Sequence, residues 1–201
     1  MIKLYGVPMS RAARNRWMLE ELGLAYETVP THFATGDTHK PDYLKLNPNG
    51  HVPTLDDDGT IVWESMAINL YLALKYGKGL WPKSVVDQGH ALQWSFWVMT
   101  EIEPPLLQAM LHRAFYPPDQ RKPELGDEGE QKLQTPLKVL DEHLASRKFV
   151  AGDSYSVADV NLASVIGWSA FAKINMAPYA NVSRWLGECT SRPAAKKAMG
   201  R

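Results

Sequence analysis

Ser10 is the first residue of the chain whose type and position could do chemistry. It precedes a helical stretch, where its hydroxyl, the unpaired N–H groups of the first turn and the positive end of the helix dipole all attract an anion. Arg11 and Arg14 follow closely and add positive potential. Serine is also a common N-cap residue, so the sequence leaves two interpretations of Ser10 open: stabilising a bound anion, or capping the helix.

Two further segments offer groups that would hold an extended peptide. The run Asn47-Pro-Asn-Gly-His-Val-Pro53 is a glycine turn that ends in a Val52-Pro53 pair. A cis bond at Pro53 would expose the N–H and C=O of Val52 as an unpaired strand edge to which a peptide adds. Glu64-Ser65 then begins an apolar helix. The carboxylate of Glu64 can pair with an ammonium group of a peptide, and the hydroxyl and N–H groups at Ser65 can donate to a carboxylate of that peptide. Capping that helix is the other interpretation of Ser65, and the two are compatible.

Three basic side chains, two before Asn47 and one within the Asn47–Pro53 run, are candidate partners for a carboxylate. His39, Lys40 and His51 can each donate to an anion. Lys40 is also interpretable as an ordinary exposed lysine at the start of a helix. A metal site built from His32, His39 and His51 is disfavoured, because their spacing is not the short spacing of zinc sites and no acidic partner is in register. The sequence therefore predicts no metal.

The first 77 residues are predicted to form a small mixed domain. Short apolar runs alternate with one amphipathic helix, and Asp56-Asp-Asp-Gly59 has the residues of a hairpin turn. The expected elements are a strand over 2–5, a helix from 10 to 23, a strand over 26–29, a loop with a short helix, strands over 52–55 and 61–63, and a helix over 65–76. The predicted order is βαβαββα.

The rest of the chain is predicted to be helical. Residues 78–87 are rich in chain breakers, and no strand-like alternation returns after them. The helices are expected over 92–110, 131–144 and 157–173 and from 182 onward, with a loop over 117–129. We therefore expect two domains, residues 1–77 and 88–201, joined by a linker over 78–87. The fold class is α/β plus all-α.

The composition of the chain excludes several classes of binding partner. The 22 basic and 22 acidic residues balance, so the chain has no net field to attract nucleic acid or an anionic membrane, and neither is expected as a partner. No secretory signal and no apolar run of about 18 residues is present, which predicts a cytoplasmic protein. The single cysteine, Cys189, excludes an internal disulfide. A thiol that reacts here is expected to arrive with a substrate.

The motifs, in their order along the chain, resemble those of one enzyme family, the cytosolic glutathione transferases. The resemblance covers essentially the whole length and implies a thioredoxin-like N-terminal domain with a helical C-terminal domain. Ser10 and the His39-Lys40 pair are most similar to the serine-based sites of the phi and theta classes and of bacterial members. The matching segments are Leu4-Tyr-Gly with Ser10-Arg and Glu20–Glu27, Asn47–Leu55, Glu64–Leu72, Ser156–Asp159, and Trp185 with Arg192-Pro-Ala194.

The resemblance implies that glutathione is the co-substrate and that the thiolate is added to a small hydrophobic electrophile. A free thiol has a pKa of about 8.5, so a donor at the sulfur raises the reactive fraction at neutral pH. Ser10 is the implied catalytic residue. The family usually forms homodimers, which we also expect here. The implied glutathione-binding residues are His39, Lys40, His51, Val52, Pro53, Glu64 and Ser65.

Two other functions stay open on the sequence. Glutathione-dependent reduction of hydroperoxides uses the same thiolate. A non-catalytic binding or regulatory module on the same fold is a further alternative, because fold does not fix function. An isomerase acting on maleyl-type substrates is a weaker option, because the chain reads Pro8-Met-Ser-Arg11 where that branch has a Ser-Ser-Cys-like opening.

Other residues in the helical half have structural interpretations. Ser156 and Asp159 are spaced as a capping box at a helix start. Cys189 is expected to be a small buried apolar residue. Five aromatic residues could line a second-substrate pocket, although aromatics at helical spacing more often belong to a core: Trp94, Trp97, Phe115, Tyr116 and Trp168.

Overall fold

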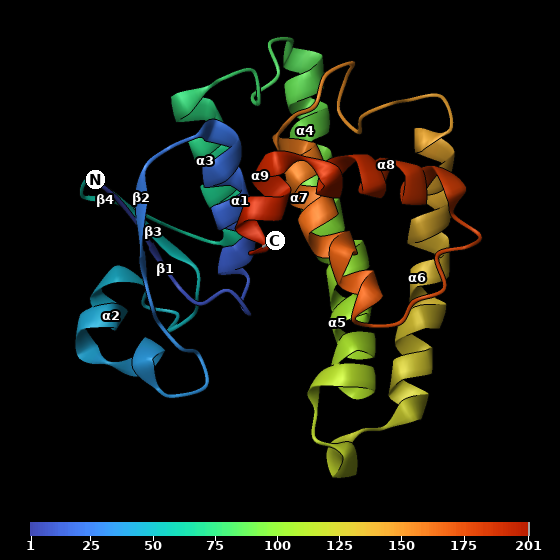
Figure 1. Ribbon diagram of the computed structural model, residues 1–201, viewed down its shortest axis with the longest axis horizontal. Coiled ribbons are helices and arrows are strands. Elements are labelled where there is room, and N and C mark those ends of the chain that lie inside the picture. The colour runs from blue at the N-terminus through green and yellow to red at the C-terminus, as the bar shows by residue number, and fades with distance from the viewer. Residues whose placement is uncertain (201) are drawn as a thin grey trace. The chain divides into compact units, whose positions relative to one another are not determined.

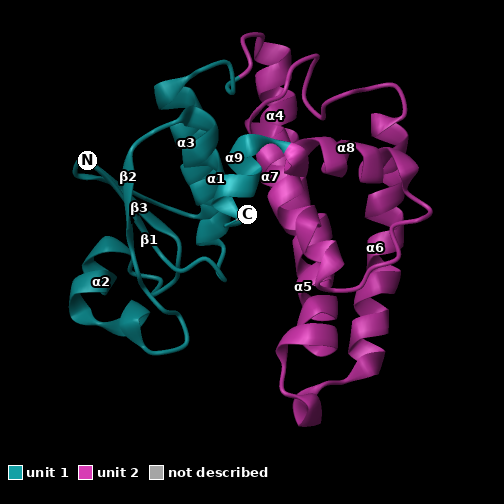
Figure 2. Cartoon of the chain, in the orientation of Figure 1, with its two compact units in different colours: residues 1–81, 192–201 teal, residues 82–191 magenta. Residues whose placement is uncertain are grey.

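The computed structural model describes residues 1–200 and divides them into two compact units (Figure 2). Unit 1 comprises residues 1–81 together with the C-terminal segment from Arg192 onward, and unit 2 comprises residues 82–191. The sequence instead assigned the C-terminal segment to the second domain. The difference has a physical cause, because this segment forms a short helix that packs on the first helix of unit 1.

Unit 1 is built around a four-stranded mixed sheet with strand order β2-β1-β3-β4 (Figure 1). β1 runs parallel to β2 and antiparallel to β3, which pairs with β4 as a hairpin. The order of elements from β1 to α3 is the predicted βαβαββα. The elements are β1 (Ile2–Tyr5), α1 (Ala12–Leu22), β2 (Tyr26–Val29), α2 (Pro41–Leu46), β3 (Thr54–Asp57), β4 (Thr60–Trp63), α3 (Ser65–Tyr76) and α9 (Pro193–Ala198).

The sheet and α1 and α3 enclose the core of unit 1. Leu4 of β1 lies opposite Leu55 of β3, and both side chains are buried. Met18 of α1 and Leu72 of α3 are fully buried as well. The strand predicted over 52–55 begins at Thr54 instead, because the proline before it has no N–H to donate to a ladder.

The C-terminal helix α9 is tied to α1 by charge and by apolar burial. Arg192 donates from Nε and Nη2 to both carboxylate oxygens of Glu21, at 2.7 and 2.8 Å. Lys197 pairs with Glu20 at 2.7 Å. Ala195 is fully buried. A bidentate guanidinium–carboxylate pair fixes both position and orientation, so the C-terminal segment is a fixed part of unit 1.

Unit 2 consists of helices in the part of the chain that the structure describes. The long helical stretch predicted over 92–110 begins earlier, because Ser84 accepts a hydrogen bond from the N–H of Asp87 at 3.0 Å and caps it. No helix in residues 1–200 is long and apolar enough to cross a membrane. The helices are α4 (Val85–Trp97), a π-helical turn (Val98–Ile102), α5 (Glu103–Met110), a second π-helical turn (Leu111–Phe115), α6 (Pro123–Leu144), α7 (Val157–Ile166) and α8 (Ala180–Ser191).

The loop predicted over 117–129 is wrong in its second half, where α6 already runs from Pro123. Proline is favoured at the first position of a helix. Gly129, the last residue of the predicted loop, lies where a Cβ atom would come within 2.6 Å of the carbonyl oxygen of Pro105 and 2.9 Å of the amide nitrogen of Ala109. The glycine therefore permits close packing of α6 on α5 and does not end the helix.

The predicted capping box at the start of α7 is confirmed. Asp159 is fully buried, and it also accepts hydrogen bonds from the N–H of Val150 at 3.1 Å and from Nε1 of Trp185 at 2.9 Å. Burial raises the pKa of Asp159, against the opposing effect of these donors and those of Ser156. The residue therefore joins α7 to α8 and to the preceding loop.

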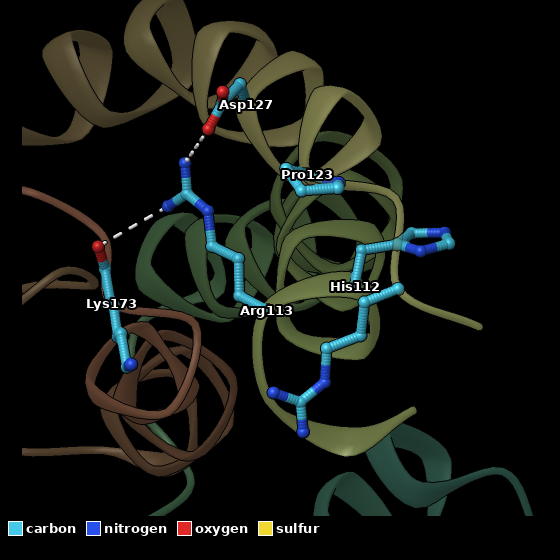
Figure 3. A pocket seen from close by; sticks show the side chains of 6 residues that line it. His112, Arg113, Pro123, Asp127 and Lys173 are labelled. Carbon is cyan, nitrogen blue, oxygen red and sulfur yellow. Dashed lines mark hydrogen bonds and ion pairs between the residues drawn. The ribbon is translucent and has the colours of Figure 1, made fainter. Parts of the chain in front are cut away.

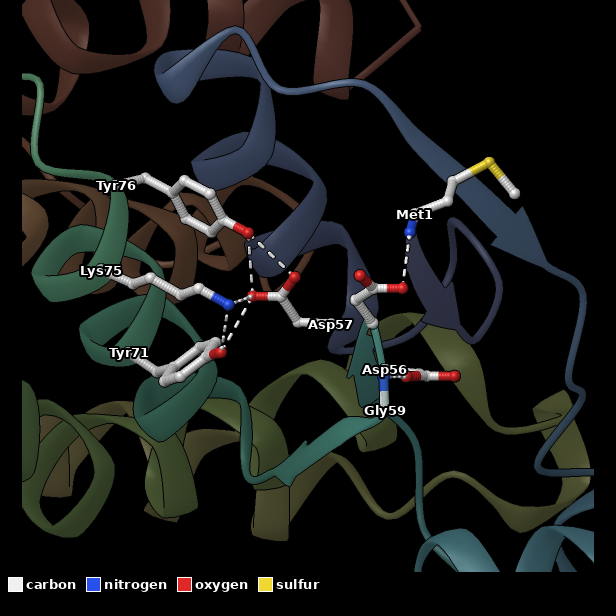
Figure 4. A network of polar contacts seen from close by, with 8 residues as sticks. Met1, Asp56, Asp57, Gly59, Tyr71, Lys75 and Tyr76 are labelled. Carbon is white, nitrogen blue, oxygen red and sulfur yellow. Dashed lines mark hydrogen bonds and ion pairs between the residues drawn. The ribbon is translucent and has the colours of Figure 1, made fainter.

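A second buried acid, Asp57 at the end of β3, ties the sheet to α3 (Figure 4). Its carboxylate accepts from Tyr71 at 2.9 Å, from Lys75 at 2.7 Å and from Tyr76 at 2.8 and 2.9 Å. Burial acts to raise the pKa of Asp57, but the hydrogen bonds from Lys75, Tyr76 and Tyr71 outweigh it and hold that pKa below its ordinary value. The charged carboxylate thus fixes the last turn of α3.

We expect Asp57→Asn to lower the free energy of unfolding by about 1–3 kcal/mol at pH 7, because three donors lose a charged acceptor. The folded-state pKa is depressed, so this stabilisation is present above the unfolded pKa of about 3.9 and is lost as pH falls through the folded pKa. Urea unfolding from pH 7 to pH 3 should therefore show the gap between variant and parent closing on acidification.

The neighbouring Asp58→Asn is the matched control. The Asp58 side chain is 88% exposed, and among the described residues it bonds only to the N-terminal ammonium group, at 3.3 Å. Its replacement should change the free energy of unfolding by no more than about 0.5 kcal/mol. Equal losses from the two substitutions would contradict a special role of the Asp57 carboxylate.

Candidate functional site

Ser10 lies just before α1, half-buried, with both sides of its hydroxyl engaged. Its Oγ donates to the carbonyl oxygen of Val7 at 2.7 Å and accepts from the N–H of Ala12 at 3.2 Å. The second contact has the form of the capping interaction considered from sequence, although the N-cap residue of α1 is Arg11, which makes no side-chain capping bond. A hydroxyl that accepts through a lone pair can still donate its proton, which here goes to Val7 and can turn to another acceptor. Capping therefore does not exclude a role in stabilising an anion.

Gly6 brings Ser10 together with Val52. Its φ of +145° is a conformation that favours glycine. A Cβ atom at this position would lie 2.5 Å from Cβ of Ala12, 3.3 Å from Oγ of Ser10 and 3.6 Å from Cβ of Val52. The end of β1, the start of α1 and the loop before β3 thus approach one another at a residue with no side chain. Two of the sequence-predicted site residues are neighbours here.

Hydrogen bonds from nearby side chains fix the loop that carries Val52. The carbonyl oxygen of His51 accepts from the hydroxyl of Tyr43 at 2.6 Å and from Nδ2 of Asn47 at 2.9 Å. The Val52–Pro53 bond is cis. In residues 1–200 neither backbone group of Val52 has a hydrogen-bond partner, since β3 begins at Thr54. Val52 therefore presents the unpaired edge that the sequence suggested.

Glu64 and Ser65 begin α3 with an uncommon backbone conformation. Glu64 has φ +72° and ψ +118°, and non-glycine residues in such regions cluster at ligand-binding sites. Its side chain is exposed, whereas Ser65 is 3% exposed. Arg14, placed near Ser10 by the sequence analysis, instead donates from Nη1 to Oγ of Ser65 at 3.3 Å. No pattern in the sequence indicates this contact between two helices.

The three residues predicted to bind a carboxylate, His39, Lys40 and His51, differ in the groups that they contact. Lys40 forms an ion pair with Asp37 at 2.6 Å. The hydrogen bonds from Lys40, the N–H of His32 and Thr35 lower the pKa of Asp37 to about 2. The ring of His39 contacts Thr38 at 3.1 Å, and the structure fixes His51 through its backbone only. No group of three or more metal-binding side chains gathers within residues 1–200.

Unit 2 has a cavity of about 250 Å³ between the end of α5, the start of α6 and Lys173 (Figure 3). Arg113 extends from its wall to Asp127 and Glu130, at 2.7 Å each, and to the carbonyl oxygen of Ala172 at 3.2 Å. Its charge is therefore used inside unit 2. None of the predicted glutathione-site residues lines this cavity.

The aromatic residues considered as pocket-lining candidates divide between core and surface. Trp94 is buried, with its ring 4.9 Å from that of Trp97 and 4.6 Å from that of His143. Phe115 is 45% exposed. Tyr116 contacts the ring of His112 at 5.1 Å. Trp94 thus belongs to the core of unit 2, the interpretation that helical spacing favoured.

Comparison with known proteins gives matches across both units. Residues 1–74 match the family model "Glutathione S-transferase, N-terminal domain", and residues 103–193 match "Glutathione S-transferase, C-terminal domain". Glutathione S-transferase F9 of Arabidopsis thaliana is 34% identical, covering 100% of this chain and 97% of that protein. Glutathione S-transferase GstB of Escherichia coli K12 is 33% identical, with coverage of 99% and 98%.

A solved structure also matches the full length. A glutathione S-transferase-I bound with lactoylglutathione has a TM-score of 0.91 and 30% identity, covering 99% of this chain and 98% of that one. The predicted fold, a thioredoxin-like N-terminal domain with a helical C-terminal domain, is thereby confirmed.

Gly6→Ala tests the close approach at the site. We expect it to lower the free energy of unfolding by about 1–3 kcal/mol, because the new methyl group overlaps Ala12 and must be accommodated by a shift of the backbone. Urea unfolding measures the change. The control is Gly187→Ala in α8, where a Cβ atom meets nothing within 4 Å. That substitution should be neutral or stabilising, and a similar loss at both positions would contradict the steric explanation.

Proposed function

The chain belongs to the glutathione S-transferase family, and on that premise we propose how its residues bind and activate glutathione. The protein is a glutathione transferase. The observation that carries the site proposal is the meeting of Ser10 and Val52 beside Gly6. A hydroxyl donor for sulfur and an unpaired strand edge for a peptide backbone are thereby adjacent.

Ser10 stabilises the thiolate. Its hydroxyl turns from the carbonyl oxygen of Val7 to the sulfur, while its lone pair continues to accept from the N–H of Ala12. A hydrogen bond to the charged form lowers the pKa of a thiol, and the positive end of α1 acts in the same direction. The thiol proton leaves to solvent. More of the bound glutathione is then the nucleophile at neutral pH.

The remaining groups hold the ends of the tripeptide. Val52 pairs through its N–H and C=O with the cysteinyl backbone, as an added strand would. Ser65 receives the γ-glutamyl carboxylate at the start of α3, and Glu64 receives the ammonium group. His39, Lys40 and His51 lie toward the glycine carboxylate, and Pro53 completes the turn.

The second substrate is a small hydrophobic electrophile. With an aryl halide, the sulfur uses its electron pair to form a bond to carbon, and the carbon–halogen bond breaks with its pair leaving on the halide. The enzyme holds the thiolate in position for this attack, which replaces an encounter in solution by a reaction within a complex. Detoxification of such compounds in the cytoplasm is the physiological role we propose.

We also propose that the protein is a homodimer, as sequence resemblance implies. Phe96 is 65% exposed and Leu92 is 38% exposed on α4, which gives unit 2 an apolar surface that a second copy would cover. Light scattering at a range of concentrations measures this state. A monomer at all concentrations would overturn the proposal.

Ser10→Ala should reduce conjugation of a reactive aryl halide at neutral pH and raise the thiolate pKa of bound glutathione. A hydrogen bond to a charged group contributes about 1.5–3 kcal/mol, which corresponds to a pKa rise of about 1–2 units. The pH dependence of kcat/KM and the ultraviolet absorbance of the thiolate both report it. Hydroperoxide reduction, measured in the same preparation, shows whether conjugation or peroxide reduction is the faster reaction of the thiolate.

Ser183→Ala is the control, since Ser183 is an exposed serine of α8 in unit 2. Its pH profile should match that of the parent. If Ser10→Ala conjugates the aryl halide as fast as the parent with an unshifted profile, Ser10 has no part in the reaction.

Asp37→Asn should tighten glutathione binding about two- to fivefold. Asp37 is ionised at any working pH and holds Lys40 at 2.6 Å, and the small expected gain reflects the weakness of ion pairs near the surface. Removing the carboxylate frees the ammonium group for the glycine carboxylate. Calorimetry at low and high salt measures the gain, which salt should diminish.

The matched control for Asp37→Asn is Asp42→Asn. It breaks the equivalent exposed pair with Lys45, at 2.7 Å, in a residue that we do not place in the site. Equal gains from the two variants would show a general charge effect. An unchanged or weaker affinity in Asp37→Asn would remove Lys40 from the glycine end.

A further inference from the structure

Four polar side chains are buried between α1 and α3, which lie side by side in unit 1 (Figure 1). Arg14 is 1% exposed and Ser65 is 3% exposed, while Asn15 and Asn69 are fully buried. Two helices pack at least as stably through apolar side chains, because burying polar groups is unfavourable unless each finds a partner. Packing alone therefore does not explain this choice of residues.

The cluster is organised by hydrogen bonds that run in both directions between the helices. Nδ2 of Asn15 donates to the carbonyl oxygen of Ser65 at 2.7 Å and to Oδ1 of Asn69 at 2.8 Å. Nδ2 of Asn69 donates back to the carbonyl oxygen of Arg14 at 3.4 Å. Nη1 of Arg14 donates to Oγ of Ser65 at 3.3 Å. Ser65 is thus held at both its backbone and its side chain.

The contact with Arg14 determines which way the Ser65 hydroxyl can act. A hydroxyl has one proton and two lone pairs, and a guanidinium group can only donate. Arg14 therefore takes a lone pair and cannot accept the proton. Within residues 1–200 the Ser65 proton has no acceptor. A buried donor is left for a ligand at the first turn of a helix of 12 residues, where anions are favoured.

We propose that Arg14 and Asn15 are positioning residues for glutathione: Arg14 orients the Ser65 hydroxyl as a donor to the γ-glutamyl carboxylate, and Asn15 fixes the start of α3 against α1. The inference rests on the glutathione site proposed above. Neither residue touches the ligand in this scheme. Both act through Ser65.

The arrangement also relates the sulfur position to the γ-glutamyl end of the peptide. Ser10 lies two residues before the first residue of α1, and Arg14 lies one helical turn further along the chain. The Asn15 amide connects this turn to the first turn of α3. The group that receives sulfur and the group that receives the γ-glutamyl carboxylate are therefore attached to one pair of helices with a buried polar link. Such a frame reduces the reorganisation needed on binding.

Arg14→Met tests the orienting role, since it keeps a flexible, unbranched side chain in place of the aliphatic part of arginine and removes the donor. We expect the glutathione Kd, measured by calorimetry, to rise about tenfold, which is 1.4 kcal/mol. Ser65→Ala should give a similar rise. Because both changes interrupt one interaction, the double variant should be no more than about twofold weaker than either single variant. Additive losses would overturn the proposal.

Binding of a second ligand distinguishes a positioning role of Arg14 from a general destabilisation of the fold. Glutathione without its γ-glutamyl α-carboxylate has no group for Ser65 to bind. Arg14→Met should bind this analogue as the parent does, and the thiolate pKa of glutathione bound to the variant should be unshifted. Weakening of both ligands to the same degree would show a merely structural role and overturn the inference.

Arg14→Lys and Asn15→Ala extend the test if Arg14→Met does not fold. Lysine also only donates, so Arg14→Lys should keep most of the affinity, whereas Asn15→Ala should weaken glutathione more than the analogue. The opposite pattern would contradict the inference. Failure of the parent protein to bind glutathione, or an unchanged Kd in Ser65→Ala, would instead overturn the proposed site itself.

Discussion

The buried polar contact between α1 and α3 is the constraint on which the proposed site depends. Asn15 donates to the carbonyl oxygen of Ser65 and to Asn69, and Arg14 donates to the Ser65 hydroxyl. Hydrogen bonds of this kind fix one relative position of two helices, whereas apolar side chains tolerate small slides. Ser10 lies just before α1, so the same contact sets the separation of the proposed sulfur position and the proposed γ-glutamyl position.

The middle of the site depends on a different constraint, the close approach of three segments at Gly6. Any side chain there would overlap Ala12. The loop before β3 reaches this point because Tyr43 and Asn47 hold the carbonyl oxygen of His51. The loop is thus fixed at the carbonyl oxygen of His51, while within residues 1–200 the N–H and C=O of Val52 have no partner and form the strand edge that we propose for the peptide.

Charge in this protein acts locally, as expected of a chain with balanced acidic and basic residues. Asp57 and Asp159 are buried acids that receive several donors each, and they join elements within unit 1 and unit 2 respectively. Asp37 is a different case, since it holds the exposed Lys40 near the proposed glycine end. Buried carboxylates here organise the fold, whereas the partly exposed Asp37 pairs with a lysine that we propose for the site.

The sequence by itself determined the order of elements and the division into a mixed and a helical half, because periodicity and turn residues act over short distances. The family and the thioredoxin-like fold followed from the resemblance of its motifs to those of the glutathione transferases. It also identified Ser156–Asp159 as a capping box. Tertiary structure alone decided that Arg14 contacts Ser65, 51 positions away, that α9 returns to α1, and that Gly129 lies inside a helix. Each depends on which surfaces pack together, and a residue's type and immediate neighbours carry no record of a partner brought close only by folding.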